Sequence, residues 1–168
     1  LSSGMALGFN ALMAARAAAQ GASLSECHAL AEKAIQHTGV LFLVDTLEFL
    51  HRGGRIGGGA AFLGTMLNLK PILELRNGRI EAVERVRTMG KAVDRLIALA
   101  EQRIDKRRPI RMAALHANAP QEAQALLDRA RERFSVSDVS EAILTDVSPV
   151  IGTHIGPGAL GFCYMAGM

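Results

Sequence analysis

The residue most capable of taking part in chemistry is His154, within Ser148-Pro-Val-Ile-Gly-Thr-His-Ile-Gly-Pro-Gly-Ala-Leu-Gly161. An imidazole titrates near neutral pH, so it can contact an anion or move a proton. The glycines that follow can adopt backbone angles closed to other residues and let a ligand approach the main chain. The alternative is a strand, a turn and a strand in which the fold satisfies the histidine. The segment alone leaves both interpretations open.

Two arginines are candidates for holding an anion. Arg55 lies in Gly-Gly-Arg-Ile-Gly-Gly-Gly, residues 53–59, where its planar guanidinium suits a carboxylate or a phosphate. It is otherwise a surface arginine in a loop that the glycines make costly to order. Arg87 lies where a predicted strand enters a predicted helix, as a second anion contact or as a cation near a helix cap. The glycines match neither a Walker A loop nor a dinucleotide fingerprint.

Four segments, in this order and spacing, resemble the C-terminal part of the DegV family, bacterial proteins that bind fatty acids. Each segment is a weak signal, but the four together make a specific match that runs from about Gly8 to Tyr164. In the family a whole α/β domain precedes this part, so the resemblance implies that the chain is a fragment. The segments are Thr46–Ile56, Phe62–Leu73, Glu84–Thr88 and Ser148–Gly161.

The resemblance implies a ligand and a partner. Family members hold a fatty acid between two domains, and some present its carboxylate to a fatty acid kinase that makes acyl-phosphate. It places Arg55, Arg87 and His154 at the carboxylate end, and we add Thr153 beside them. The hydroxyl residues that complete this pocket in the family come from the upstream domain, so the surface left open here is also a possible site of homo-oligomer formation.

The resemblance also implies a tunnel for the acyl chain. Its predicted lining is Phe62, Leu63 and Met66, on a short apolar helix within residues 60–67, together with Ile155. In most proteins such a helix is simply part of the core.

Composition excludes several classes of function. The net charge of +3 is modest and a single Tyr leaves no basic-aromatic pattern, so we expect no nucleic-acid partner. The Ala-rich residues 5–19 are too short and too polar for stable membrane insertion. Cys27 and Cys163 have no metal-ligand spacing, and we expect both to be buried in a cytoplasmic protein without a metal or other cofactor.

Periodicity predicts an α/β fold with a mixed sheet flanked by helices. The resemblance implies that residues 1–39 are a helical segment from the interdomain region and that residues 40–168 are the lipid-binding domain. Ser23–Glu26 is a predicted capping box within the first of these. Predicted helices cover about residues 5–19, 24–37, 46–52, 60–67, 89–105 and 120–134. Predicted strands cover residues 40–44, 111–116, 139–144, 149–154 and 159–165, together with a hairpin within residues 69–88.

The hairpin is the sharpest local prediction. Asn77-Gly78 favours a type I′ turn, which places Leu75 opposite Ile80 and Leu73 opposite Ala82. The other face, which carries Glu74, is charged and is expected to be wet near the turn.

Two hypotheses about function remain. In the first, the chain is a non-catalytic carrier that holds a long-chain fatty acid for a kinase. In the second, it is a metabolic enzyme domain with Arg55 and Arg87 as anion clamps and His154 as acid or base. No Ser-His-Asp order, paired carboxylates or metal cluster stands out, so we expect no independent catalysis.

Overall fold

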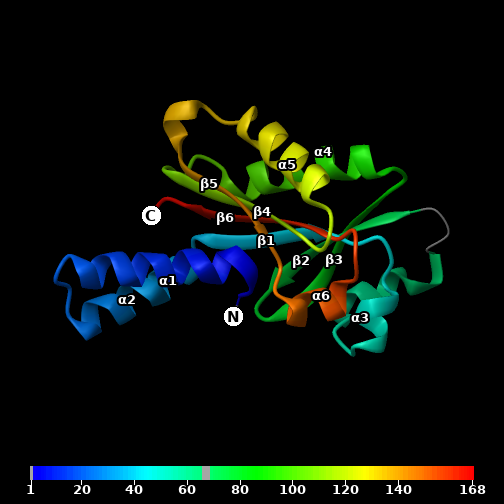
Figure 1. The fold of residues 1–168 in the computed structure, drawn as a ribbon, viewed down its shortest axis with the longest axis horizontal. Helices are drawn as coiled ribbons and strands as arrows, with labels where there is room; N and C mark the ends of the chain where they lie inside the picture. Colours follow the sequence, from blue (N-terminus) through cyan, green and yellow to red (C-terminus); the bar gives the residue numbers. More distant parts are fainter. Residues whose placement is uncertain (1, 66–68) are drawn as a thin grey trace.

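The computed structural model describes residues 2–65 and 69–168, without the side chains of residues 62–65. The chain folds into a six-stranded sheet in the order β3-β2-β1-β6-β4-β5, with helices on both faces (Figure 1). β4 and β5 are parallel, and the other neighbouring strands are antiparallel. The predicted α/β fold with a mixed sheet is therefore confirmed.

The strands are β1 (Thr38–Leu43), β2 (Lys70–Arg76), β3 (Arg79–Val86), β4 (Ile110–His116), β5 (Val139–Asp146) and β6 (Leu160–Ala166). The α-helices are α1 (Gly4–Ala19), α2 (Leu24–Ile35), α3 (Glu48–Arg52), α4 (Met89–Ile104), α5 (Pro120–Arg131) and α6 (Pro149–Ile155). Two short 3-10 helices are η1 (Gly57–Thr65) and η2 (Val136–Asp138).

The hairpin has the predicted register. Leu75 pairs with Ile80 and Leu73 with Ala82, and both turn residues, Asn77 and Gly78, have positive φ as a type I′ turn requires. The prediction of a wet charged face is wrong at Glu74, which is only 8% exposed. Its carboxylate accepts hydrogen bonds from Arg103 of α4 at 3.1 and 3.4 Å, so α4 covers this face.

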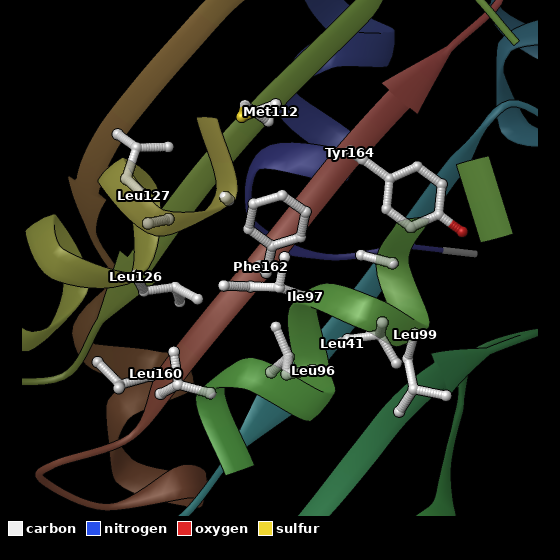
Figure 2. Packing of buried hydrophobic residues seen from close by; sticks show 14 of the residues in the cluster. Leu41, Leu96, Ile97, Leu99, Met112, Leu126, Leu127, Leu160, Phe162 and Tyr164 are labelled. Atoms are coloured by element: carbon white, nitrogen blue, oxygen red, sulfur yellow. The ribbon is translucent and has the colours of Figure 1, made fainter. Parts of the chain in front are cut away.

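The main core lies between the sheet and helices α4 and α5. Figure 2 shows Leu96 and Ile97 of α4 and Leu126 and Leu127 of α5 in one buried cluster with Phe162 of β6. Phe162 and Leu96 are fully buried. Because successive side chains of a strand point to opposite faces, only alternate residues of β1 and β6 enter this core.

Helix α1 packs on the opposite face of the sheet. Ala6 and Phe9 are fully buried there, in one cluster with Ala113 of β4 and Cys163 of β6. α2 packs against α1 and begins at the predicted capping box, in which the Ser23 hydroxyl accepts from the Glu26 amide at 3.3 Å. In the described part of the chain, no helix combines the length and the apolar character needed to cross a membrane.

The predicted strand at residues 149–154 is wrong, because this segment forms helix α6. The Ser148 hydroxyl accepts a hydrogen bond from the Ile151 amide at 3.4 Å, and Pro149 occupies the first turn. These are helix-start features that outweigh the β-branched Val-Ile pair. Gly156, with φ of 78°, ends the helix, so His154 lies in its last turn.

We predict that Leu96→Ala lowers the free energy of unfolding by about 2–5 kcal/mol, because it leaves a cavity in the core. Leu24→Ala is the control: Leu24 is also a helical leucine but is 88% exposed, and its loss should cost less than about 0.5 kcal/mol. Chemical denaturation of both variants measures the difference. Equal stabilities would contradict the placement of the core.

Candidate functional site

An open cavity of about 190 Å³ lies on the face of the sheet opposite α4 and α5. Its floor is built from side chains of β1, β2, β3, β4 and β6, and its sides from α3, α6 and the first residues of α1. Nearly all of this surface is apolar; its polar lining residues are Ser3, Arg55 and His154. The floor includes Val40, Phe42, Leu75, Ile80, Leu115 and Gly161.

Helices α3 and α6 meet through two reciprocal contacts between a ring and a glycine. The imidazole of His154, in α6, lies against Gly53 at the end of α3, where a Cβ atom would overlap Nδ1. The ring of Phe49, in α3, lies against Gly156 at the end of α6, where a Cβ atom would overlap the ring. Each helix therefore ends in a glycine that the other helix requires.

Arg55 is tied to the same glycine as His154. Its Nη1 donates a hydrogen bond to the Gly53 carbonyl oxygen at 2.9 Å, and its backbone amide donates to the Leu50 carbonyl at 2.9 Å. Gly53 thus carries the imidazole against its Cα and the guanidinium on its carbonyl. Two residues from distant parts of the chain meet on one peptide, at the wall of an apolar cavity.

The glycines after Arg55 have a packing role that the sequence did not reveal. Gly57 has a φ of 47°, and a Cβ atom there would overlap the Ile80 carbonyl of β3. A Cβ atom on Gly58 would overlap the Glu81 carboxylate. The loop that carries Arg55 therefore runs between two close contacts, one at Gly53 and one on β3.

The interpretation that the fold satisfies His154 requires hydrogen-bond partners for its ring nitrogens, and the described residues do not provide one for Nδ1. Its Nδ1 is buried and has no hydrogen-bond partner within the described residues. Buried polar atoms are normally paired, because an unpaired one costs about 1–3 kcal/mol. The ring is held instead by packing against Gly53 and by its place in α6.

The other predicted polar residues lie outside the cavity wall. Thr153 is exposed, and its Oγ1 donates a hydrogen bond to the Pro149 carbonyl at 2.8 Å, within α6. Arg87 is exposed between β3 and α4 and is not among the residues that line the cavity. The structure thus brings Arg55 and His154 together on Gly53, while Thr153 and Arg87 do not line the cavity.

Of the predicted apolar lining residues, Ile155 lines the cavity. Phe62 and Leu63 have side chains outside the described residues, as does Met66 entirely. Sequence reasoning missed the floor, because period-two alternation does not say which face of a strand a helix will cover. Ile151 was also missed: one helical turn before Ile155, it could have been found had residues 149–155 been predicted as a helix.

The thiol in the floor adds no charge to the cavity. Burial raises the pKa of Cys163 to about 12, so this thiol stays protonated at neutral pH. Both cysteines are free; Cys163 is buried as predicted, whereas Cys27 is only partly buried, so the prediction is wrong at that residue. Across the described ranges, no group of three or more His, Cys, Asp and Glu residues is placed to hold a metal ion.

Comparison with known proteins gives one consistent result. The profile of the family described as "Uncharacterised protein, DegV family" matches residues 1–167. A DegV domain-containing protein of Streptomyces coelicolor is 46% identical over 157 residues, which is 94% of this chain and 55% of that protein. Protein DegV of Bacillus subtilis is 36% identical over 161 residues, 95% of this chain and 56% of that protein.

Solved structures agree. A Thermus thermophilus DegV family protein, described by its fatty acid binding, superposes with a TM-score of 0.90 and 38% identity, over 98% of this chain and 58% of that one. DegV of Bacillus subtilis, described as a fatty acid binding protein, superposes with a TM-score of 0.81 and 36% identity, over 96% and 57%. The chain therefore spans somewhat more than half the length of these relatives.

We predict that Gly53→Ala lowers the free energy of unfolding by about 1–3 kcal/mol, because the new methyl group overlaps the His154 ring. The His154 ring resonances should also shift in the NMR spectrum. Gly90→Ala is the matched control, since a Cβ atom there meets nothing within 4 Å. A Gly53→Ala protein with wild-type stability and an unmoved ring would contradict the contact.

Proposed function

The chain belongs to the DegV family, and on that premise we propose that it binds a long-chain fatty acid whose acyl chain occupies the apolar cavity. The carboxylate is assigned to Arg55 and His154. One observation carries this assignment: the two side chains meet on Gly53, at the wall of a cavity that is otherwise almost entirely apolar. An amphipathic ligand needs this combination.

The two polar groups retain the capacity to contact a carboxylate. A guanidinium has five N–H donors, and the hydrogen bond of Arg55 to the Gly53 carbonyl uses one nitrogen. His154 has Nδ1 turned against Gly53, which leaves Nε2 as the nitrogen for the ligand. A charge-assisted pair of this kind is stronger than neutral hydrogen bonds.

The cavity of this chain encloses only part of such a ligand. Its volume of about 190 Å³ is below the roughly 300–1,000 Å³ of typical ligand pockets, and the relatives are longer proteins. We therefore assign to this chain one wall of the site, with the carboxylate contacts Arg55 and His154 and the apolar floor. Thr153 and Arg87 remain predictions, because neither lines this wall.

We further propose that the protein presents the carboxylate to a fatty acid kinase in the cytoplasm. Arg55 is exposed and His154 is half-buried, which supports a carboxylate that a second protein can reach. The enzyme alternative is less well supported. Among the described lining residues, the only titratable group besides Arg55 and His154 is Cys163, whose pKa is raised by burial. It offers no ready nucleophile.

Fatty acid titration of the full-length protein tests the carboxylate site. Arg55→Ala and His154→Ala should each weaken binding by about ten- to a hundredfold, since a hydrogen bond to a charged group contributes about 1.5–3 kcal/mol. Arg52→Ala is the control, because Arg52 is exposed, pairs with Glu48 and does not line the cavity. Unchanged affinity in both site variants would contradict the proposal, and unchanged affinity in Arg87→Ala would remove Arg87 from the site.

A reconstituted assay tests the carrier role. We expect full-length protein, fatty acid and ATP to yield acyl-phosphate only when a fatty acid kinase from the same organism is added, because the described lining residues supply groups that hold an anion and no activated nucleophile. Acyl-phosphate can be trapped with hydroxylamine and counted. Product formed without the kinase would favour the enzyme alternative instead.

A further inference from the structure

Strand β6 lies inside the sheet, between β1 and β4, yet one of its residues is not buried. Six of its seven residues are buried, and the exception is Gly161. Gly161 lines the cavity floor, so the backbone of an interior strand is open to the cavity at this residue. Elsewhere along β6, side chains from both faces cover the strand.

The fold itself does not require glycine at this position. Gly161 does not have a positive φ, and a Cβ atom there would meet its nearest neighbour, Leu115 Cβ, at 3.5 Å, an ordinary van der Waals distance. Gly39, also in the sheet, is different: a Cβ atom there would overlap the Tyr164 ring. A glycine inside a strand lowers stability relative to alanine and often marks a close approach by a ligand.

The neighbours of Gly161 define the shape of the opening. It pairs with Phe42 of β1 on one side and with Leu115 of β4 on the other, and both of these side chains line the cavity. Gly161 is therefore a notch in the floor between two larger apolar side chains. The notch has apolar sides, and the strand beneath it is hydrogen-bonded to both neighbouring strands.

We propose that Gly161 is an acyl-chain-contacting residue of the floor, whose missing side chain lets a hydrocarbon chain lie directly on the backbone of β6. The inference rests on the proposed function, because it assigns part of the acyl chain to this notch. Any larger side chain at residue 161 would occupy the same volume. The depth of the floor at this point is thus set by the side chain at residue 161.

The test compares Gly161→Ala and Gly161→Leu in the full-length protein, with hexadecanoic acid as the probe in displacement of a fluorescent fatty acid. Each methylene displaced from the floor should weaken binding about fourfold. Gly161→Ala should therefore bind about fourfold more weakly, and Gly161→Leu more than tenfold more weakly. Gly90→Leu is the control with unchanged affinity, because a Cβ atom at Gly90 meets nothing within 4 Å.

Thermal unfolding separates this effect from a loss of structure. The free variants should melt at or above the wild-type temperature, since the added side chain covers exposed floor, while the ligand-induced rise in melting temperature should shrink in Gly161→Leu. Hexadecanoic acid that binds wild type and Gly161→Leu equally would overturn the inference and leave the proposed function standing. If Gly161→Leu fails to fold, a folded Gly161→Ala with wild-type affinity overturns it. A wild-type protein that binds no fatty acid overturns the proposed function, and this inference with it.

Discussion

The alternation of side chains along β1 and β6 is the constraint on which the rest of the molecule depends. Leu41 and Phe162 point into the core under α4 and α5, while their neighbours Phe42 and Gly161 point to the cavity. When one residue of a strand faces one side of the sheet, the next residue faces the opposite side. The sheet therefore separates two tasks, with most of the buried apolar surface on one face and the candidate site on the other.

Features set by a few adjacent residues could be predicted from the sequence, whereas features set by tertiary packing could not. Local signals predicted local structure well, because a type I′ turn at Asn77-Gly78 and a capping box at Ser23–Glu26 depend on a few adjacent residues. The strand predicted for residues 149–154 is wrong, because the Val-Ile pair favours a strand whereas Ser148 and Pro149 start a helix. The prediction that Glu74 is exposed to water is wrong for a different reason, since only the tertiary packing of α4 brings Arg103 onto its carboxylate.

The candidate site was likewise predictable in its individual residues but not in how they are arranged. Arg55 and His154 could be singled out as residues from their glycine-rich surroundings, and the structure adds that they meet on Gly53. Their proximity could not be predicted from the sequence, because it depends on the docking of helices α3 and α6. The floor was hidden for a similar reason: Gly161 and Leu115 look like ordinary strand residues until it is known which face the helices leave uncovered.

The sharing of Gly53 by both polar groups has a thermodynamic consequence. α3 and α6 have five and seven residues, too short to be stable as isolated helices, so each depends on the other for its place. A ligand held by both Arg55 and His154 would bridge the ends of the two helices, and by linkage it would strengthen their docking as much as their docking strengthens its binding. Occupancy of the site would then slow amide hydrogen exchange in α3 and α6 more than in α4, whose protection comes from the core on the far face of the sheet.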